Sequence, residues 1–320
     1  MRVEVAVVGA GIIGTLAAYE LRKRGLSVLL LDAGKEGAAT LASAGMLAPY
    51  PEGLSGEVLE AALFGLEYYP GLLEELAAKG WKVEAGFSGT QVVALSEVEK
   101  EAWAAFPSGK QPAAQESLSY PVRGGRGART FPGGYVHPKA LREALLKALE
   151  VMETPFLQAE VEEVKEGGVR GRWREEPFTA QARFVLLAVG AWGSRFGLGV
   201  RPLKGEALVL EGPAPPAPLF AGEGYLLPRE GGVYVGATQR EGWAQGVDLF
   251  GLRWLSDYAH ERFPLLAGAR FREALWGYRP VGELFVGEVE RGVLAAVGHG
   301  RNGILLAPWT AKRILELLGV

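Results

Sequence analysis

The first 32 residues constrain the fold more than any other part of the chain. An apolar run over residues 3–8 is followed by the turn GAGIIG at residues 9–14 and by a helical stretch that Gly25 is placed to end. SVLLLD then has the composition of a second buried strand, which ends on Asp32. This order of elements predicts a βαβ unit of the dinucleotide-binding type.

The three glycines of the turn have separate physical roles. Gly9 permits the tight turn, Gly11 lets a pyrophosphate approach the backbone, and Gly14 lets the helix pack close to the strand. The first helical residues, Ile12 and Ile13, present backbone N–H groups and the positive end of the helix dipole to a phosphate. The turn is therefore a predicted phosphate-binding site.

An acidic residue closes the βαβ unit. Asp32 lies 18 positions after Gly14, where a carboxylate accepts hydrogen bonds from ribose hydroxyls, and Ala33 adjoins it. A carboxylate there repels the 2′-phosphate of NADP, so NAD and FAD remain as the candidate cofactors.

The composition excludes several other functions. Lysine and arginine total 34 against 37 acidic residues, so no basic field is available for a nucleic acid. Cysteine is absent, which removes disulfides, iron–sulfur clusters, thiol catalysis and a cysteinyl flavin tether. The three histidines predict no metal centre. A single asparagine, Asn302, suggests a thermophilic source. The first strand leaves no room for a signal peptide, and no apolar run reaches the ~20 residues of a membrane span, so we expect a cytoplasmic protein.

Along the chain, segments of parallel βα type alternate with antiparallel segments. The helical stretch 57–79 is expected to break at Pro70, the segment from residue 83 to resemble an exposed-sheet strand, and residues 107–134 to lack a clear core. The pattern predicts an α/β (α+β) fold, in which a Rossmann-like FAD-binding domain is interleaved with an antiparallel-sheet substrate domain. The expected ranges are 1–82, 135–203 and 285–320 for the first domain, and 83–134 and 204–284 for the second.

Five motifs carry a resemblance to a known family. SAGMLAP follows the βαβ unit, and LLAVGAW, YLLPREGGVYVGAT, WGYRP and GHGRNGILLAP follow in that order. The sequence resembles the glycine oxidase and D-amino-acid oxidase family of FAD-dependent amine oxidoreductases, and most of all its thiamine-pathway glycine oxidases. The resemblance runs from residue 3 to residue 318, and its last motif is the most specific.

The resemblance implies a set of site residues. Arg279 would bind the substrate carboxylate, with the Tyr225 hydroxyl and Arg301 assisting. The FAD would be non-covalent and held by residues along the whole chain: Gly9, Gly11, Ile12, Ile13, Gly14, Asp32, Ala33, Ser43, Ala44, Gly45, Met46, Val161, Gly190, Gly300, Asn302, Gly303 and Ile304.

The implied activity is oxidative deamination of glycine, sarcosine or a small D-amino acid. Hydride would pass to flavin N5, and oxygen would reoxidise the flavin, giving an imine or 2-oxo acid, ammonia and hydrogen peroxide. The glycine imine would supply thiamine thiazole synthesis. Alternatives are a D-amino-acid dehydrogenase that uses a quinone or another acceptor, a sarcosine-oxidase-like enzyme, and a flavin-fold protein without activity. An enzyme of modified tRNA is disfavoured by the acidic pI of 5.9. The oligomeric state, including a homo-oligomer, is left open.

Overall fold

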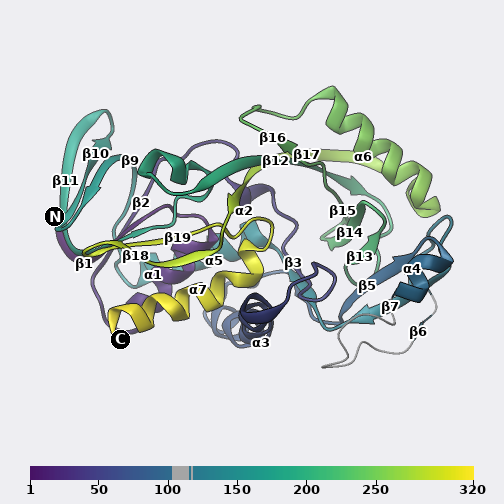
Figure 1. The fold of residues 1–320 in the computed structure, drawn as a ribbon, viewed down its shortest axis with the longest axis horizontal. Helices are drawn as coiled ribbons and strands as arrows, with labels where there is room; N and C mark the ends of the chain where they lie inside the picture. The colour runs from purple at the N-terminus through teal and green to yellow at the C-terminus, as the bar shows by residue number, and fades with distance from the viewer. Residues whose placement is uncertain (103–114, 117) are drawn as a thin grey trace.

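A computed structural model describes residues 1–102, 115–116 and 118–320, and these form two large sheets (Figure 1). The first sheet has seven strands, in the order β1-β2-β9-β10-β11-β19-β18, with β1 also paired to β11. Its strands are β1 (Arg2–Val8), β2 (Val28–Asp32), β9 (Phe156–Lys165), β10 (Gly168–Trp173), β11 (Glu176–Leu187), β18 (Phe285–Glu290) and β19 (Val293–Val297).

The centre of this sheet is parallel. β2 pairs with β1 and β9, and β11 pairs with β1 and β19, all in parallel register, so their carboxyl ends share one edge. β9, β10 and β11 also form an antiparallel ribbon, and a cluster of buried apolar side chains packs between this ribbon and one face of the parallel strands. Ligands of open parallel sheets bind outside the carboxyl ends of the strands, which places the expected site at this edge.

Helices cover the opposite face of the first sheet, and Figure 1 shows them together on one side. They are α1 (Ile12–Lys23), α3 (Gly56–Ala78), α5 (Pro138–Val151) and α7 (Gly303–Leu318). α5 begins at Pro138, which occupies its first turn, and the His137 Nδ1 accepts a hydrogen bond from the Ala140 N–H. The predicted break at Pro70 is wrong: α3 continues through it, since packing on α7 outweighs the lost hydrogen bond.

The second sheet runs β17-β12-β15-β14-β13-β5-β7-β6, with the short strand β16 also paired to β12. Helix α6 (Leu249–Arg262) covers one face, and the other face packs on residues that follow the βαβ unit. The strands are β5 (Thr90–Ala94), β6 (Gln115–Glu116), β7 (Gly127–Phe131), β12 (Val200–Glu211), β13 (Leu219–Ala221), β14 (Gly224–Arg229), β15 (Gly232–Gly236), β16 (Arg240–Glu241) and β17 (Arg270–Gly282).

Short elements connect the two sheets. β3 (Met46–Leu47), β8 (Gly134–Val136) and β4 (Ala85–Gly86) form a small third sheet. The others are α2 (Ala39–Ala42), α4 (Glu97–Ala102) and the 3₁₀ turns at Gly190–Phe196 and Pro264–Leu266.

Two expectations about the second sheet are wrong. The described part of residues 107–134 does contribute to a core, because β7 pairs with β5 and buries Ala128 and Phe131. β5 is itself mostly buried rather than an exposed-sheet strand. Both errors have one cause: the apolar partners of these strands lie far away in the sequence, on β13 and α6. Residues 103–114 and 117 lie outside the described part of the chain.

The strands of the two sheets come from separate parts of the chain. The first sheet draws on residues 2–32, 156–187 and 285–297, and the second on residues 90–131 and 200–282. This interleaving follows the predicted α/β architecture. The predicted domain boundaries themselves stay a prediction.

Candidate functional site

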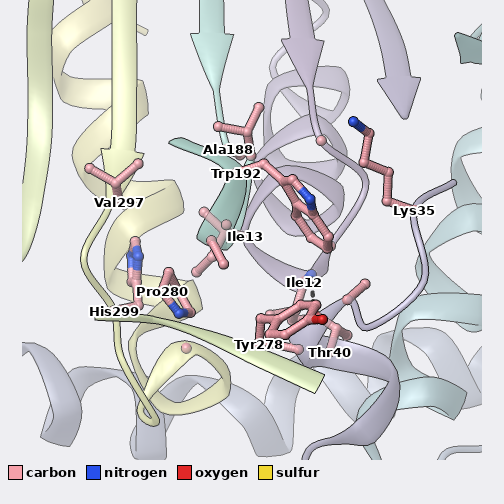
Figure 2. Close-up of a pocket in the computed structure, with 18 of the residues that line it drawn as sticks. Ile12, Ile13, Lys35, Thr40, Ala188, Trp192, Tyr278, Pro280, Val297 and His299 are labelled. Atoms are coloured by element: carbon pink, nitrogen blue, oxygen red, sulfur yellow. Dashed lines mark hydrogen bonds between the residues drawn. The ribbon is translucent and has the colours of Figure 1, made fainter. Parts of the chain in front are cut away.

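One elongated cavity is lined by residues of both sheets. It lies at the carboxyl ends of β1, β2, β11 and β19 and is closed by α2 and β17. Figure 2 shows Lys35 at one end of it and Val297 and His299 at the other, with Trp192 and Tyr278 between them. Its position is the one that a doubly wound sheet assigns to a nucleotide cofactor.

The glycine turn forms one wall of the cavity. Gly9 has φ +105°, and a Cβ there would collide with the Ala188 carbonyl of the neighbouring strand. A Cβ at Gly14 would collide with the Gly9 carbonyl. Gly11 is different, because a Cβ there would meet only Thr40 Oγ1, at 3.3 Å. Gly9 and Gly14 therefore serve the packing of the turn, whereas Gly11 leaves free space facing the cavity.

Side chains of neighbouring segments hold this turn in place. The Asp32 carboxylate accepts hydrogen bonds from the Ala10 N–H at 2.6 Å and the Gly34 N–H at 2.7 Å. The Ile12 N–H donates to Thr40 Oγ1 at 3.0 Å. Asp32 lines the cavity with lone pairs still available on its two oxygens, as contact with a ribose requires.

The end of the cavity beside β9 and β11 contains further charged residues. Val161 and Gly190 line it, together with three charged residues that form two ion pairs and that the sequence did not indicate. The Glu160 carboxylate bridges Lys35 Nζ at 2.8 Å and Arg195 Nη1 at 2.5 Å. These side chains are partly exposed, so the ion pairs stabilise the fold weakly and mainly fix the rim of the cavity.

The segment 43–46 is pinned from the second sheet. Arg229 donates from Nη2 to the Ala44 carbonyl at 2.7 Å and, more weakly, to the Ser43 carbonyl. Burial lowers the pKa of Arg229, and the guanidinium stacks on the Tyr234 ring at 5.2 Å. The Tyr234 hydroxyl donates to the Ala42 carbonyl at 2.9 Å. These hydrogen bonds to backbone carbonyls hold a loop of small residues in one conformation.

The residues of this segment have different surroundings. Ser43 lines the cavity, and Ala33 and Ile13 do so as well. Gly45 lies under β8, where a Cβ would collide with the Val136 carbonyl, and Ala44 and Met46 pack against the second sheet. The structure therefore brings Ser43 directly to the cavity and places the next three residues behind it.

The turn before α7 forms the other long wall. Gly300, Gly303 and Ile304 line the cavity, so the N-terminus of a 16-residue helix faces it. Asn302 is the N-cap residue that precedes that helix, and it lines a neighbouring cavity instead. His299 is buried at 4% exposure, and burial lowers its pKa to about 4, so its ring is neutral at physiological pH.

Arg279 projects from β17 into the same cavity. Its Nη1 donates to the Thr238 carbonyl at 3.1 Å, and among the described residues no carboxylate lies within ion-pair distance of it. Beside it on β17, the Tyr278 ring is 3% exposed and meets Trp276 edge-on at 5.3 Å. Arg279 is a half-buried cation whose guanidinium is free to receive an anion.

Tyr225 lies on β14 and, unlike Arg279, is not among the residues that line the cavity. Its ring stacks on Tyr234 with centroids 6.2 Å apart and planes 1° from parallel. Burial raises the Tyr225 pKa, and the carboxylate of Glu52 raises it further, while Arg279 lowers it. The hydroxyl is therefore protonated at neutral pH and can donate a hydrogen bond.

Arg301 is engaged by an acidic residue that the sequence did not indicate. Its Nε donates to a carboxylate oxygen of Glu52, whose side chain is only 7% exposed against 46% for Arg301. Glu52 follows the SAGMLAP motif by three positions but lies 249 positions from Arg301, so no local signal connects them.

Comparisons with known proteins identify the family to which the chain belongs. The model of the FAD dependent oxidoreductase family, DAO, matches residues 4–317. The chain belongs to this family. It is 32% identical to the glycine oxidase of Bacillus licheniformis, over 99% of this chain and 93% of that protein. It is 31% identical to the bifunctional protein ThiO/ThiG of a Synechocystis strain, over 98% of this chain and 51% of that one.

Among solved structures, the glycine oxidase of Geobacillus kaustophilus has a TM-score of 0.89 at 28% identity, covering 99% of this chain and 95% of the other. The family, the α/β fold, the FAD cofactor and the oxidoreductase class predicted from the sequence are confirmed. In this FAD-dependent oxidoreductase, the free space at Gly11 and the open lone pairs of Asp32 fit the diphosphate and ribose of FAD.

Two negative findings apply to the described residues. They contain no group of three or more His, Asp or Glu side chains arranged to hold a metal ion. None of their helices is long and apolar enough to cross a membrane.

Proposed function

We propose that the protein is a glycine oxidase, which deaminates glycine and, more slowly, sarcosine and small D-amino acids. The observation that carries the proposal is the position of Arg279. It extends an unpaired guanidinium into the cavity that the glycine turn and Asp32 also line. A carboxylate on Arg279 would hold a short amino acid between β17 and the ring end of the cofactor.

The chain's own residues position the substrate. The planar guanidinium of Arg279 binds a carboxylate through two parallel hydrogen bonds, which fixes both the place and the orientation of the α-carbon. The Tyr225 hydroxyl donates to the same carboxylate. Tyr278, which is 3% exposed, lines the same cavity as Arg279, and exclusion of water there would strengthen this pair.

The site holds few groups that could move a proton. His299 is neutral and buried, and burial raises the pKa of Tyr225. The substrate amine therefore enters in its neutral form. FAD, when bound, would accept a hydride, which carries two electrons, from the α-carbon of the amino acid and pass both electrons to oxygen. The N-terminus of α7 faces the cavity and stabilises negative charge there.

The proposal is tested with purified protein that contains its flavin. Hydrogen peroxide is measured with glycine, sarcosine, D-alanine and D-proline, and we expect glycine to give the highest kcat/KM. Turnover that reduces a dye but yields little peroxide would instead indicate a dehydrogenase. A protein that takes up FAD and oxidises none of these amines would refute the proposal.

Arg279→Lys tests the carboxylate contact. A lysine keeps the charge but loses the two-pronged geometry, so we expect KM for glycine to rise by about 100-fold with the flavin retained. Arg272→Lys is the matched control: Arg272 lies on the same strand, exposed, and donates to the Glu230 carbonyl. Loss of flavin from the Arg279→Lys protein would show that Arg279 serves the cofactor instead.

Several finer statements belong to the same proposal. A role in thiamine thiazole synthesis is supported by the likeness to glycine oxidases and to the ThiO/ThiG protein. A cytoplasmic location and a thermophilic source are supported by the composition alone. The domain ranges given above are supported by the separate origins of the two sheets.

A further inference from the structure

Arg279 and Arg301 both line the cavity in which the substrate carboxylate would lie, and Glu52 is paired with Arg301. The charges of all three residues act on the pKa of the nearby Tyr225, the fourth member of this cluster. Tyr225 is protonated and neutral. The cluster therefore contains two positive charges and one negative charge before a substrate arrives.

The negative charge, on Glu52, is paired with Arg301. Glu52 accepts the hydrogen bond from Arg301 Nε, and its side chain is 7% exposed. Burial raises the pKa of Glu52, while Arg301 and then Arg279 act against that rise. The backbone of Glu52 is held in a turn, in which its N–H donates to the Ala48 carbonyl at 3.1 Å.

The two arginines are consequently unequal. Among the described residues, the Arg279 side chain has one hydrogen bond, to the Thr238 carbonyl, and no ion pair, whereas the charge of Arg301 is balanced by Glu52. One substrate carboxylate on Arg279 makes the cluster neutral. A second anionic group on the substrate would meet Arg301 in its paired state and would lie close to the Glu52 carboxylate, where like charges repel.

We propose that Glu52 is a specificity-determining residue, which restricts the site to amino acids with a single carboxylate by neutralising Arg301. The inference rests on the proposed function, in that Arg279 is taken to receive the substrate carboxylate. Glu52 is not among the residues that line the cavity, whereas Arg279 and Arg301 are. It acts by removing a cation that would otherwise bind a second acid group.

The test uses two ligands of nearly the same shape, malonate and its monoamide malonamate, titrated into the oxidised holoprotein at pH 8. Calorimetry and the change in the flavin spectrum both report the Kd, and neither requires turnover. We expect the wild-type protein to bind malonamate more tightly than malonate. In Glu52→Gln, the ratio of malonate affinity to malonamate affinity should rise by about tenfold or more, since Arg301 becomes available.

The double variant Glu52→Gln/Arg301→Gln separates charge from space. It restores the wild-type net charge and leaves no unpaired buried ion, so the ratio should return to within about twofold of the wild-type value. A purely structural role of the Glu52–Arg301 pair would change both affinities together and leave the ratio unmoved.

Three results would overturn the inference. They are a wild-type preference for malonate, an unchanged ratio in a correctly folded Glu52→Gln protein, and a raised ratio that persists in the double variant. The affinities of the wild-type protein for malonate and malonamate test the inference even if the single variant does not fold. Binding with the wrong ratio refutes the role of Glu52 alone, whereas absence of binding by both acids refutes the role of Arg279 as well.

Discussion

The guanidinium of Arg279 occupies the space that a side chain at position 205 would fill. A Cβ built on Gly205 would lie 2.5 Å from Arg279 Cζ. The two residues belong to the paired strands β12 and β17, in which Leu203 lies opposite Arg279 and Gly205 opposite Gly277. The absence of a side chain at Gly205 thus leaves room for the guanidinium that we propose binds the substrate carboxylate, a role that the position of Gly205 in the sequence does not reveal.

We predict that Gly205→Ala displaces this guanidinium without unfolding the protein, because the end of a long side chain moves more easily than the backbone. KM for glycine should rise by at least about tenfold with the flavin spectrum unchanged, measured by steady-state kinetics. Gly199→Ala is the control, since a Cβ at Gly199 meets nothing within 4 Å. A wild-type KM in the Gly205→Ala protein would show that Arg279 does not bind the substrate from this position.

Thr238 connects the same arginine to a buried carboxylate. Its carbonyl accepts from Arg279, while its hydroxyl accepts from the Glu206 N–H at 2.9 Å and donates to the Glu206 carboxylate at 3.1 Å. Glu206 is 1% exposed and also pairs with Lys204 and Arg240. Thr238 is therefore the link between the site and the buried charges beneath α6.

We predict that Thr238→Val destabilises the protein by about 1–3 kcal/mol, because the Glu206 N–H and carboxylate lose a partner in the interior. Unfolding of the holoprotein in denaturant measures the loss, and KM for glycine should rise with it. Thr238→Ser keeps the hydroxyl and should recover most of both. Equal stability of the wild-type and Val proteins would mean that water or another group replaces the hydroxyl.

The βαβ unit could be predicted from the sequence because it is local. Gly9, Gly14 and Asp32 lie within 32 residues, and their roles follow from spacing alone. The unit forms as expected because the sequence and the contacts that stabilise it are close together.

Contacts across the chain could not be predicted in the same way. Glu52 meets Arg301, and Arg229 meets Ala44 at a separation of 185 positions, so only the fold brings them together. The burial of β7 and the continuity of α3 through Pro70 have the same origin, since both are decided by partners on distant elements.

The glycine turn gives a prediction with two contrasting variants. Gly9→Ala forces an alanine to φ +105° and against the Ala188 carbonyl, so the fold itself should be destabilised. Gly11→Ala has room in the protein but fills the space of the diphosphate. We expect it to fold and to lose FAD affinity by at least about tenfold, measured by quenching of FAD fluorescence. Wild-type affinity in the Gly11→Ala protein would place the diphosphate elsewhere.

His299 predicts a dependence of stability on pH. Its pKa falls from 6.5 to about 4 on burial, so the unfolded chain binds a proton between these values and the folded protein does not. Stability is therefore fully present above pH 6.5 and decreases as the pH falls toward 4, by about 3 kcal/mol from this residue.

His299→Gln should flatten that decrease, measured as the free energy of unfolding at fixed FAD concentration between pH 7 and pH 4. The exposed His260 on α6 supplies the control variant His260→Gln. A His299→Gln protein that loses stability as steeply as the wild type would show that the buried ring is protonated in the folded state.

The most direct test of the account is the anaerobic mixing of the wild-type holoprotein with glycine, followed through the visible spectrum of the flavin. The account predicts that the oxidised flavin is bleached, that glyoxylate and ammonia appear in equal amounts, and that admitted oxygen restores the spectrum with release of peroxide. A flavin that stays oxidised with saturating glycine, in a protein whose spectrum still responds to carboxylate ligands, would contradict it.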